Sequence, residues 1–170
     1  VKGLLSHDKG RTFFTIITTL DELGYDMEWQ VLNSKNHGVP QNRERVFIIG
    51  HLRGTSRPQV FPFTEVQRQY TGDKPKTWVA DFRNDEGMRV RKNGCCPTLP
   101  AHLNHMATSS SPSDLIMVKP DTEIRRLTPT ECERLQGFPD GWTEGVSDTQ
   151  RYKCLGNAVT VNVIRDIFER

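Results

Sequence analysis

Apolar residues in the first part of the chain recur at helical spacing. Between Thr12 and Leu23 every apolar position except Phe14 falls on one stripe, made of Phe13, Ile16, Ile17, Leu20 and Leu23. Gly24 follows, at the position where helices commonly end. The pattern therefore predicts an amphipathic helix over residues 12–23 that is terminated by Gly24.

Two shorter apolar runs follow, and their length and β-branched content are typical of strands. They predict strands over Met27–Leu32 and Val46–His51, joined by a polar loop over Asn33–Asn42. Helix, strand, loop and strand in this order are compatible with the closing half of a doubly wound sheet whose last two strands are antiparallel.

The pattern changes after Arg53. Prolines become frequent and a serine-rich run, Ser109–Ser113, interrupts the chain; the prolines are Pro58, Pro62, Pro75, Pro97, Pro100, Pro112 and Pro120. Such a segment accommodates only short strands and loops. We expect a small, irregular β-rich lobe here, inserted between two core-like parts of the chain.

Two helix signals lie near the end of the chain. Thr128 and Glu131 have the spacing of a capping box around Pro129, and Gly137 stops the predicted helix. Asn157 is placed to cap a final helix whose buried stripe would be Val161, Ile164, Ile167 and Phe168. That helix start could equally face an anion or the carboxylate of a cofactor, with simple packing as the alternative.

Composition limits the range of functions. The hydrophobic fraction is a lean 35% and the net charge only +2, so nucleic-acid binding would rest on a local basic cluster such as Arg89-Val90-Arg91-Lys92. A solvated charged face is the alternative for that cluster. The four cysteines fit neither a disulfide framework nor a zinc pattern, which indicates a reducing, cytoplasmic compartment. No apolar run predicts a membrane span and no metal site is expected.

The most informative chemistry lies where the polar loop enters the second strand. Gln41, Arg43 and Arg45 alternate there, so their side chains share one face if strand geometry extends back to Gln41. An amide and two guanidinium groups on one face suit a planar or anionic group such as a nucleobase or a phosphate. An edge strand with a solvated charged face is the alternative.

Three segments together resemble the DNA cytosine-5 methyltransferase family. Gln41–Arg45 resembles the eighth motif of that family, Gln-x-Arg-x-Arg; Arg125–Asp140 resembles its ninth motif, and Tyr152–Val159 its tenth. The long stretch between the first two motifs lies where the family has its target-recognition region. Three motifs in the family's order are a specific signal, although each alone is weak.

Other family motifs are absent from this chain. The nucleophile of the family lies in a Pro-Cys dipeptide, whereas only the reverse order, Cys96-Pro97, occurs here, and there is no Gly-x-Gly of a cofactor loop. The residues from Val1 resemble those that begin at the valine of the family's Glu-Asn-Val motif. We therefore expect a C-terminal part of a methyltransferase, inactive alone, whose catalytic cysteine and glutamate belong to a missing N-terminal half, in the same chain or in a separate subunit.

The resemblance implies a fold and a division of the chain. The expected fold class is α/β: the C-terminal part of a Rossmann-like, S-adenosylmethionine-dependent methyltransferase fold with the inserted recognition lobe. Residues 1–52 would belong to the catalytic domain, residues 53–124 would form the target-recognition region, and residues 125–170 would return to the catalytic domain. The implied reaction is methyl transfer from S-adenosylmethionine to carbon 5 of a flipped cytosine in double-stranded DNA, in a bacterial or phage restriction-modification system.

The resemblance also assigns roles to residues. Arg45 would donate to the carbonyl oxygen of the flipped cytosine, Arg43 would pair with a phosphate or hold the pocket loop, and Gln41 would orient that loop. The methyl donor would contact Asn157, Ala158 and Val159. DNA would contact the Thr98-Leu99 pair and the basic cluster, namely Thr98, Leu99, Arg89, Arg91 and Lys92.

Two other functional classes share these features. A non-catalytic DNA-binding or regulatory subunit could keep the recognition lobe without the chemistry, although such a protein would not need the two arginines of a cytosine pocket. A transfer-RNA cytosine-5 methyltransferase would share the motifs, although the long segment between residues 53 and 124 favours DNA.

Overall fold

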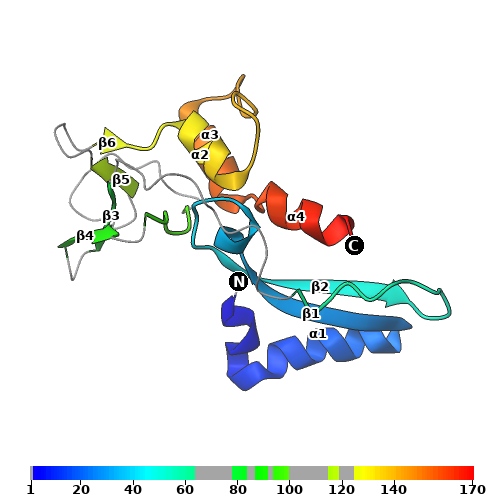
Figure 1. Ribbon diagram of the computed structural model, residues 1–170. Coiled ribbons are helices and arrows are strands. Elements are labelled where there is room, and N and C mark those ends of the chain that lie inside the picture. The colour runs from blue at the N-terminus through cyan, green and yellow to red at the C-terminus, as the bar shows by residue number, and fades with distance from the viewer. Residues whose placement is uncertain (1, 64–77, 84–86, 92–93, 100–114, 119–124) are drawn as a thin grey trace.

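The computed structural model describes residues 2–63, 78–83, 87–91, 94–99, 115–118 and 125–170 (Figure 1). In chain order, the helices are α1 (Arg11–Glu22), α2 (Pro129–Gln136), α3 (Asp148–Asn157) and α4 (Val161–Phe168), and the strands are β1 (Tyr25–Asn33), β2 (Glu44–Leu52), β3 (Trp78–Arg83), β4 (Gly87–Arg91), β5 (Leu115–Val118) and β6 (Arg125–Arg126). Short 3-10 helices are formed by Lys2–Leu5, His7–Gly10 and Ser34–His37.

α1 and the β1–β2 hairpin confirm the predicted order of helix, strand, loop and strand. Gly24 has a φ of +87° and its N–H bonds to the carbonyl oxygen of Asp21 at 2.9 Å, so it terminates α1 as expected. β1 and β2 are antiparallel, as predicted, with Met27 opposite Gly50. Each strand extends one or two residues beyond its predicted ends, and the loop between them contains the 3-10 helix Ser34–His37.

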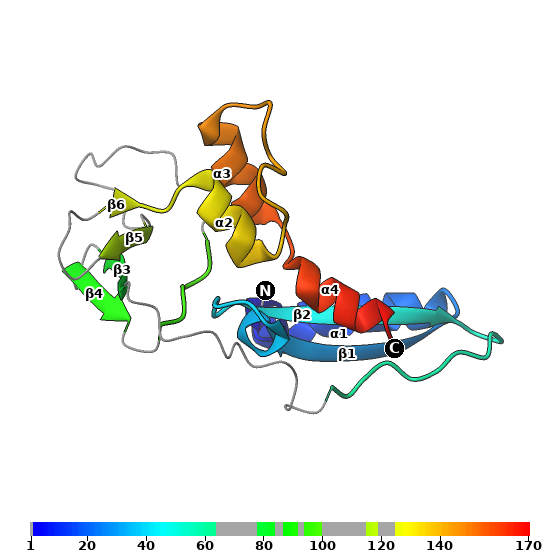
Figure 2. The same ribbon diagram turned by 45° about the horizontal axis from the view of Figure 1, so that its top comes forward.

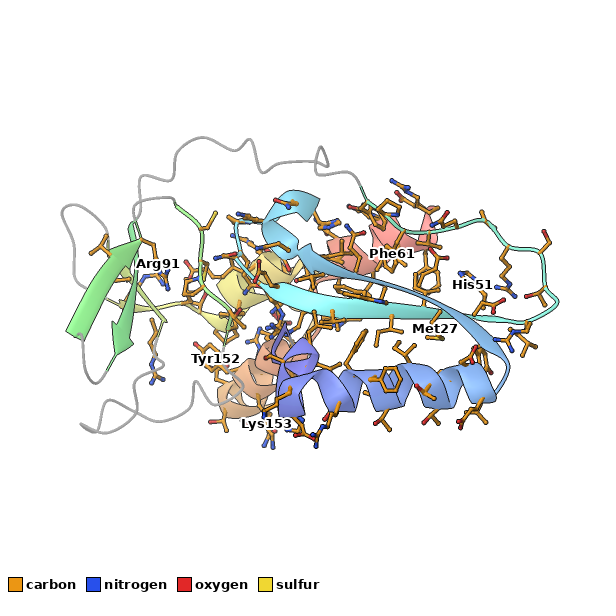
Figure 3. All side chains as sticks on the ribbon, turned by 90° about the horizontal axis from the view of Figure 1, so that it is seen from below. Met27, His51, Phe61, Arg91, Tyr152 and Lys153 are labelled. Carbon is orange, nitrogen blue, oxygen red and sulfur yellow. The ribbon has the colours of Figure 1, made fainter. Side chains whose placement is uncertain are left out.

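The hairpin is covered on both faces (Figures 1 and 2). α1 lies against one face, where the rings of Phe13 and Trp29 meet edge to face with centroids 5.0 Å apart. α4 and the segment 60–63 lie against the other face, and Figure 3 shows Met27 and Phe61 on opposite sides of the hairpin. The second face holds a hydrophobic cluster of Leu32, Phe61, Phe63 and Val163, with Phe47, Ile49, Val60 and Ile167 around it.

The second sheet lies apart from the hairpin (Figure 1) and has the strand order β4-β3-β5-β6, with every pair antiparallel. Its strands β3, β4 and β5 have 6, 5 and 4 residues, as expected for a proline-rich segment. β6 pairs with β5, so the sheet includes Arg125 and Arg126 beyond the expected boundary at residue 124. The run Ser109–Ser113 lies outside the described residues.

α2 has the N-terminus that the sequence predicts. The Thr128 hydroxyl accepts the N–H of Glu131, the Glu131 carboxylate accepts the N–H of Thr128, and Pro129 is the first helical residue. Gly137 ends the helix with a φ of +77°. These contacts involve only near neighbours in the chain, which is why the sequence pattern was sufficient to predict the start and the end of α2.

The expected role of Asn157 as a helix cap is wrong. Asn157 is the last residue of α3, a helix that the sequence pattern did not predict, and Thr160 precedes α4. The expected stripe on α4 is also partly wrong, because Phe168 is 84% exposed whereas Val163 and Asp166 are buried. α3 has few apolar residues, so periodicity could not detect it; Ser147 and Asp148 at its start were the available signal.

A second hydrophobic core connects the segment 94–99 to α2 and α3. It contains Cys96, Leu99, Leu127, Cys132 and Leu155, with Leu135, Phe138 and Tyr152 packed around it. The Tyr152 hydroxyl adds a hydrogen bond to the carbonyl oxygen of Leu127 at 2.7 Å. This core holds the chain on both sides of the inserted segment together.

The four cysteines are free, as predicted. Among the described residues, no group of histidine, cysteine, aspartate and glutamate side chains is arranged to hold a metal ion. Within the same residues, no helix has the length and apolar character needed to cross a membrane.

Candidate functional site

The Gln41–Arg45 segment is attached to the segment 94–99 by backbone hydrogen bonds. The Asn42 N–H bonds to the carbonyl oxygen of Cys96 at 2.7 Å, and the Cys96 N–H bonds to that of Pro40 at 2.8 Å. Gln41 thereby forms an isolated parallel bridge with Cys96, while regular strand geometry begins only at Glu44. Two segments more than fifty residues apart in sequence thus form one local structure.

Gln41 and Arg43 are buried, with exposed fractions of 0% and 4%. The alternative of a solvated charged face is therefore wrong for these two residues. Both amide atoms of Gln41 and the Nε and Nη1 atoms of Arg43 have no hydrogen-bond partner within the described part of the chain. Unpaired buried polar groups of this kind cost about 1–3 kcal/mol each and are rare in native proteins. Within the described residues, these atoms therefore keep hydrogen-bonding capacity that the contacts of the segment do not use.

Arg43 reaches across the molecule to the turn after α3. Its Nη2 donates to the carbonyl oxygen of Ala158 at 2.6 Å and to that of Gly156 at 3.3 Å. Burial and, to a smaller extent, the neighbouring charge of Arg45 together lower the pKa of Arg43 to about 10. The guanidinium nevertheless stays charged at neutral pH, so it can hold the two carbonyl oxygens.

Arg45 has a different environment. Its side chain is half-buried, and its Nη1 donates to the carbonyl oxygen of Glu44 at 2.7 Å. Burial lowers the pKa of its guanidinium. Because the Arg45 guanidinium is only half-buried, a ligand can reach it from the surface. The expected contact of Arg45 with a base stays a prediction, and this geometry is compatible with it.

The turn Asn157–Val159 is fixed from two sides. Arg43 binds the carbonyl oxygen of Ala158, and the buried Thr160 hydroxyl bonds to Ser34 Oγ at 2.8 Å and to Gln136 Oε1 at 3.0 Å. On this fixed backbone Asn157 is exposed, Ala158 is half-buried and the Val159 side chain is 45% exposed. An accessible amide beside an accessible apolar group fits a ligand with polar and apolar parts, such as the expected S-adenosylmethionine.

The expected DNA contacts fall in different places. Thr98 lies beside the Gln41–Arg45 segment, and its hydroxyl donates to the carbonyl oxygen of Asn42 at 3.4 Å. Leu99 is 1% exposed and its side chain packs in the second core. Only the backbone of Leu99 is therefore left to make the predicted contact with DNA. Arg91 is half-buried on β4, away from the hairpin (Figure 3). The Arg89 side chain and all of Lys92 lie outside the described residues.

Several buried polar contacts beside the site had no sequence signal. His37 Nδ1 and Asp166 Oδ2 lie 2.7 Å apart, and Asn162 donates to the carbonyl oxygen of His37 at 2.8 Å. Together with the Ser34–Thr160 contact, they join the loop before Gln41 to α4. Each pairs residues more than a hundred positions apart, which spacing along the chain cannot reveal.

Comparison with known proteins finds matches to DNA methylases along the whole chain. Residues 1–95 and 64–170 match the family model described as C-5 cytosine-specific DNA methylase. Type II methyltransferase M.DsaV of Dactylococcopsis salina is 32% identical over 100% of the chain and 54% of its own length. The corresponding values are 34%, 100% and 60% for M.NlaX of Neisseria lactamica, and 35%, 100% and 49% for M1.ScrFI of Lactococcus lactis subsp. cremoris. The chain thus spans about half the length of these curated relatives.

Solved structures with the same fold are more distant in sequence. The S. pombe Dnmt2 methyltransferase is 17% identical, with a TM-score of 0.61 over 94% of this chain and 59% of its own. The Entamoeba histolytica methyltransferase EhMeth is also 17% identical, with a TM-score of 0.53 over 93% of this chain and 57% of its own. The mixed α/β structure described above therefore matches part of their fold.

Proposed function

Because this chain belongs to the family of C-5 cytosine-specific DNA methylases, we propose that it is the C-terminal part of a DNA (cytosine-5) methyltransferase. The assembled enzyme would transfer a methyl group from S-adenosylmethionine to carbon 5 of a flipped cytosine within a specific DNA site. The observation that carries this proposal is the position of Arg43, which joins the segment expected to face the base to the turn expected to face the methyl donor.

The roles of individual residues follow from the chemistry that this reaction requires. A cytosine inside a duplex must be flipped into a pocket before its ring can react. Arg45 would donate to the cytosine carbonyl oxygen and stabilise the negative charge that develops on the ring. Gln41 and Arg43 would hold the pocket segment, and Asn157, Ala158 and Val159 would line the donor site. S-adenosylmethionine, which the family uses, supplies an electrophilic methyl group when it is bound.

The attacking thiolate would come from outside this chain, because no Pro-Cys dipeptide occurs here. Cys96 and Cys132 are buried in the second core. Burial, together with the nearby charges of Glu131 and Glu133, raises the pKa of Cys132 to about 12, so this thiol would be a poor nucleophile.

A partner polypeptide, or a preceding segment of the same chain, would supply the rest of the fold. Two observations support this proposal besides the length of the relatives. No residue of α1 is fully buried although the helix is amphipathic, and Phe14 and Leu23 are 71% and 65% exposed. Within the described residues, the hairpin forms a sheet of two strands only. Further strands beside it would complete the proposed doubly wound sheet.

The recognition of a DNA sequence would belong to residues 53–124. Loops held by a rigid scaffold are common sites of recognition, and the Cys96 backbone is bonded to the Gln41–Arg45 segment. Exchanging this lobe for that of a relative with another target should change the site that bisulfite mapping shows to be methylated. An active chimera that still methylates the original site would place recognition elsewhere.

The proposed function is tested by reconstitution. The chain alone should incorporate no labelled methyl group into duplex DNA. It should do so when assembled with a polypeptide that carries the Pro-Cys and glycine-rich motifs of the family, and we call this complex the assembled enzyme. Activity of the chain alone, or failure of the two polypeptides to associate and react, would contradict the proposal.

A further inference from the structure

We propose that Arg43 is a positioning residue that sets the affinity of the assembled enzyme for its methyl donor by fixing the turn after α3, and that it does not contact DNA phosphate. This inference rests on the proposed function. It concerns a side chain whose role the sequence left open between binding a phosphate and holding the pocket loop.

Helix geometry explains why α3 needs Arg43. The last carbonyl oxygens of a helix have no partner within the helix and must be satisfied by other groups. Gly156 lies in the last turn of α3 and Ala158 follows the helix directly. Both of their carbonyl oxygens accept from Arg43 Nη2, at 3.3 and 2.6 Å. A cation at this position also interacts favourably with the helix dipole, so Arg43 caps α3 from another part of the chain.

Burial argues against a phosphate contact. Arg43 is 4% exposed, whereas the phosphates of a duplex lie on the outside of the DNA and are met by surface side chains. Arg45, two residues later, is half-buried and so is the more accessible of the two arginines. The buried position instead favours fixed hydrogen bonds within the protein.

The geometry of the turn depends on Arg43, because the other side-chain contacts lie before and after the turn. Gln136 Nε2 donates to the carbonyl oxygen of Leu155 at 3.1 Å, and the Thr160 hydroxyl bonds to Gln136 Oε1 and to Ser34 Oγ. These contacts hold the backbone immediately before and after the turn. Arg43 alone among the described side chains holds the turn itself, on which Asn157 and Val159 are exposed.

The test compares three variants of the assembled enzyme. Arg43→Met removes every donor but keeps the length of the side chain, and Arg43→Lys restores a cation with fewer, differently directed donors. Arg165→Met is the matched control, because Arg165 is exposed on α4, outside the proposed site, and its guanidinium lies 3.9 Å from the Glu169 carboxylate. Equilibrium binding of S-adenosylhomocysteine and of duplex DNA is measured for each variant, with the KM for the donor and kcat.

Arg43→Met should weaken S-adenosylhomocysteine binding about ten- to a hundredfold, the usual effect of losing hydrogen bonds to a charged group. The KM for the donor should rise by a similar factor, while duplex affinity and its salt dependence stay within about twofold of the original values. Arg43→Lys should recover part of the loss, and Arg165→Met should change neither affinity. Hydrogen exchange of the backbone at 157–159 should be faster in Arg43→Lys than in the unmodified enzyme.

Other outcomes would overturn the inference. Weaker duplex binding with a reduced salt dependence and an unchanged donor affinity would make Arg43 a phosphate contact. Loss of folding even in Arg43→Lys would make it part of the folding core. An unmodified assembled enzyme that binds no S-adenosylhomocysteine would contradict the proposed function as well, whereas equal donor binding by the unmodified enzyme and Arg43→Met would contradict this inference alone.

Discussion

Two arginines only two positions apart have different surroundings, and the difference separates their roles. Arg43 is buried and donates to two carbonyl oxygens of the turn after α3. Arg45 is half-buried, and its guanidinium donates to the carbonyl oxygen of its own neighbour, Glu44. A local contact of this kind is easily exchanged for a ligand. Arg45 is therefore the arginine that we expect to touch the flipped base.

In the assembled enzyme, Arg45→Ala should lower turnover while leaving duplex affinity nearly unchanged. Losing one charge-assisted donor in a closed site costs about 3 kcal/mol, or about 10²-fold in kcat. Single-turnover methylation and duplex binding measure the two effects separately. Arg165→Ala, at an exposed ion pair on α4, is the control. Unchanged turnover in Arg45→Ala would refute the role.

Glu131 shows how one carboxylate can serve two contacts at once. It completes the capping box of α2 and also accepts from Arg125, at 2.9 and 2.8 Å. The Arg125 guanidinium, with the Thr128 N–H and hydroxyl, lowers its pKa to about 2 against the opposing effect of burial. Because the pKa is lower in the folded state, ionised Glu131 stabilises the fold above its ordinary pKa of 4.5.

This stabilisation should be lost as the pH falls from about 4.5 towards about 2. Glu131→Gln should lower the free energy of unfolding near neutral pH by about 1 kcal/mol, the usual effect of losing a cap, and should weaken the pH dependence below about pH 4.5. Urea unfolding of the chain near pH 6 and near pH 3 measures both effects. Glu22→Gln, at an exposed position of α1, should leave the pH profile unchanged.

At the scale of elements, β1 uses side chains to bind an extended segment. The carboxylate of Glu28 accepts the N–H groups of Val60 and Phe61, at 3.0 and 2.8 Å, and lies 2.7 Å from His51 Nε2. Gln30 exchanges two hydrogen bonds with the backbone of Phe63, at 2.7 and 3.1 Å, much as a neighbouring strand would. These contacts fix the segment 60–63 over the hairpin, immediately before the chain enters the recognition region.

Gln30→Met should release this segment, because it removes both hydrogen bonds to Phe63 and leaves the buried backbone groups without partners. We expect a loss of about 1–3 kcal/mol in unfolding free energy and faster hydrogen exchange at Phe63. Gln59→Met makes the same change at an exposed position and serves as the control. Equal exchange at Phe63 in both variants would show that Gln30 does not hold the segment.

At the scale of the whole molecule, two hydrophobic clusters organise the chain and one helix remains poorly covered. The first cluster joins the hairpin to α4, and the second joins the segment 94–99 to α2 and α3. α1 packs on the hairpin but has no fully buried residue, and Phe14 is 71% exposed. An apolar helix surface of this kind suits the proposed contact with the other half of the enzyme.

Phe14→Glu should therefore weaken the assembly of the two halves and leave the stability of this chain nearly unchanged. Burial of a phenylalanine contributes about 1.5–3 kcal/mol, so the dissociation constant should rise about ten- to a hundredfold. Thr19→Glu introduces the same charge at an exposed position of α1 and should have a smaller effect. Analytical ultracentrifugation measures assembly, and equal constants for the two variants would exclude Phe14 from the interface.

The sequence by itself determined several local elements and the family of the chain. Gly24 terminates α1, the capping box starts α2, and the two apolar runs form an antiparallel hairpin, as predicted. These features depend on backbone preferences and on contacts between near neighbours, so the residues that decide them lie within a few positions of one another. The order of three motifs likewise identified the family, to which the whole chain matches.

Only the tertiary structure decided how those residues are used. Arg43 donates hydrogen bonds to Gly156 and Ala158, which are 113 and 115 residues away. The sequence pattern was equally compatible with a solvent-exposed Arg43 side chain, whereas in the fold the side chain is buried. Packing likewise made Asn157 the last residue of α3 and placed Leu99 in a core. Burial and long-range hydrogen bonds depend on which segments meet in space, and no local pattern encodes that meeting.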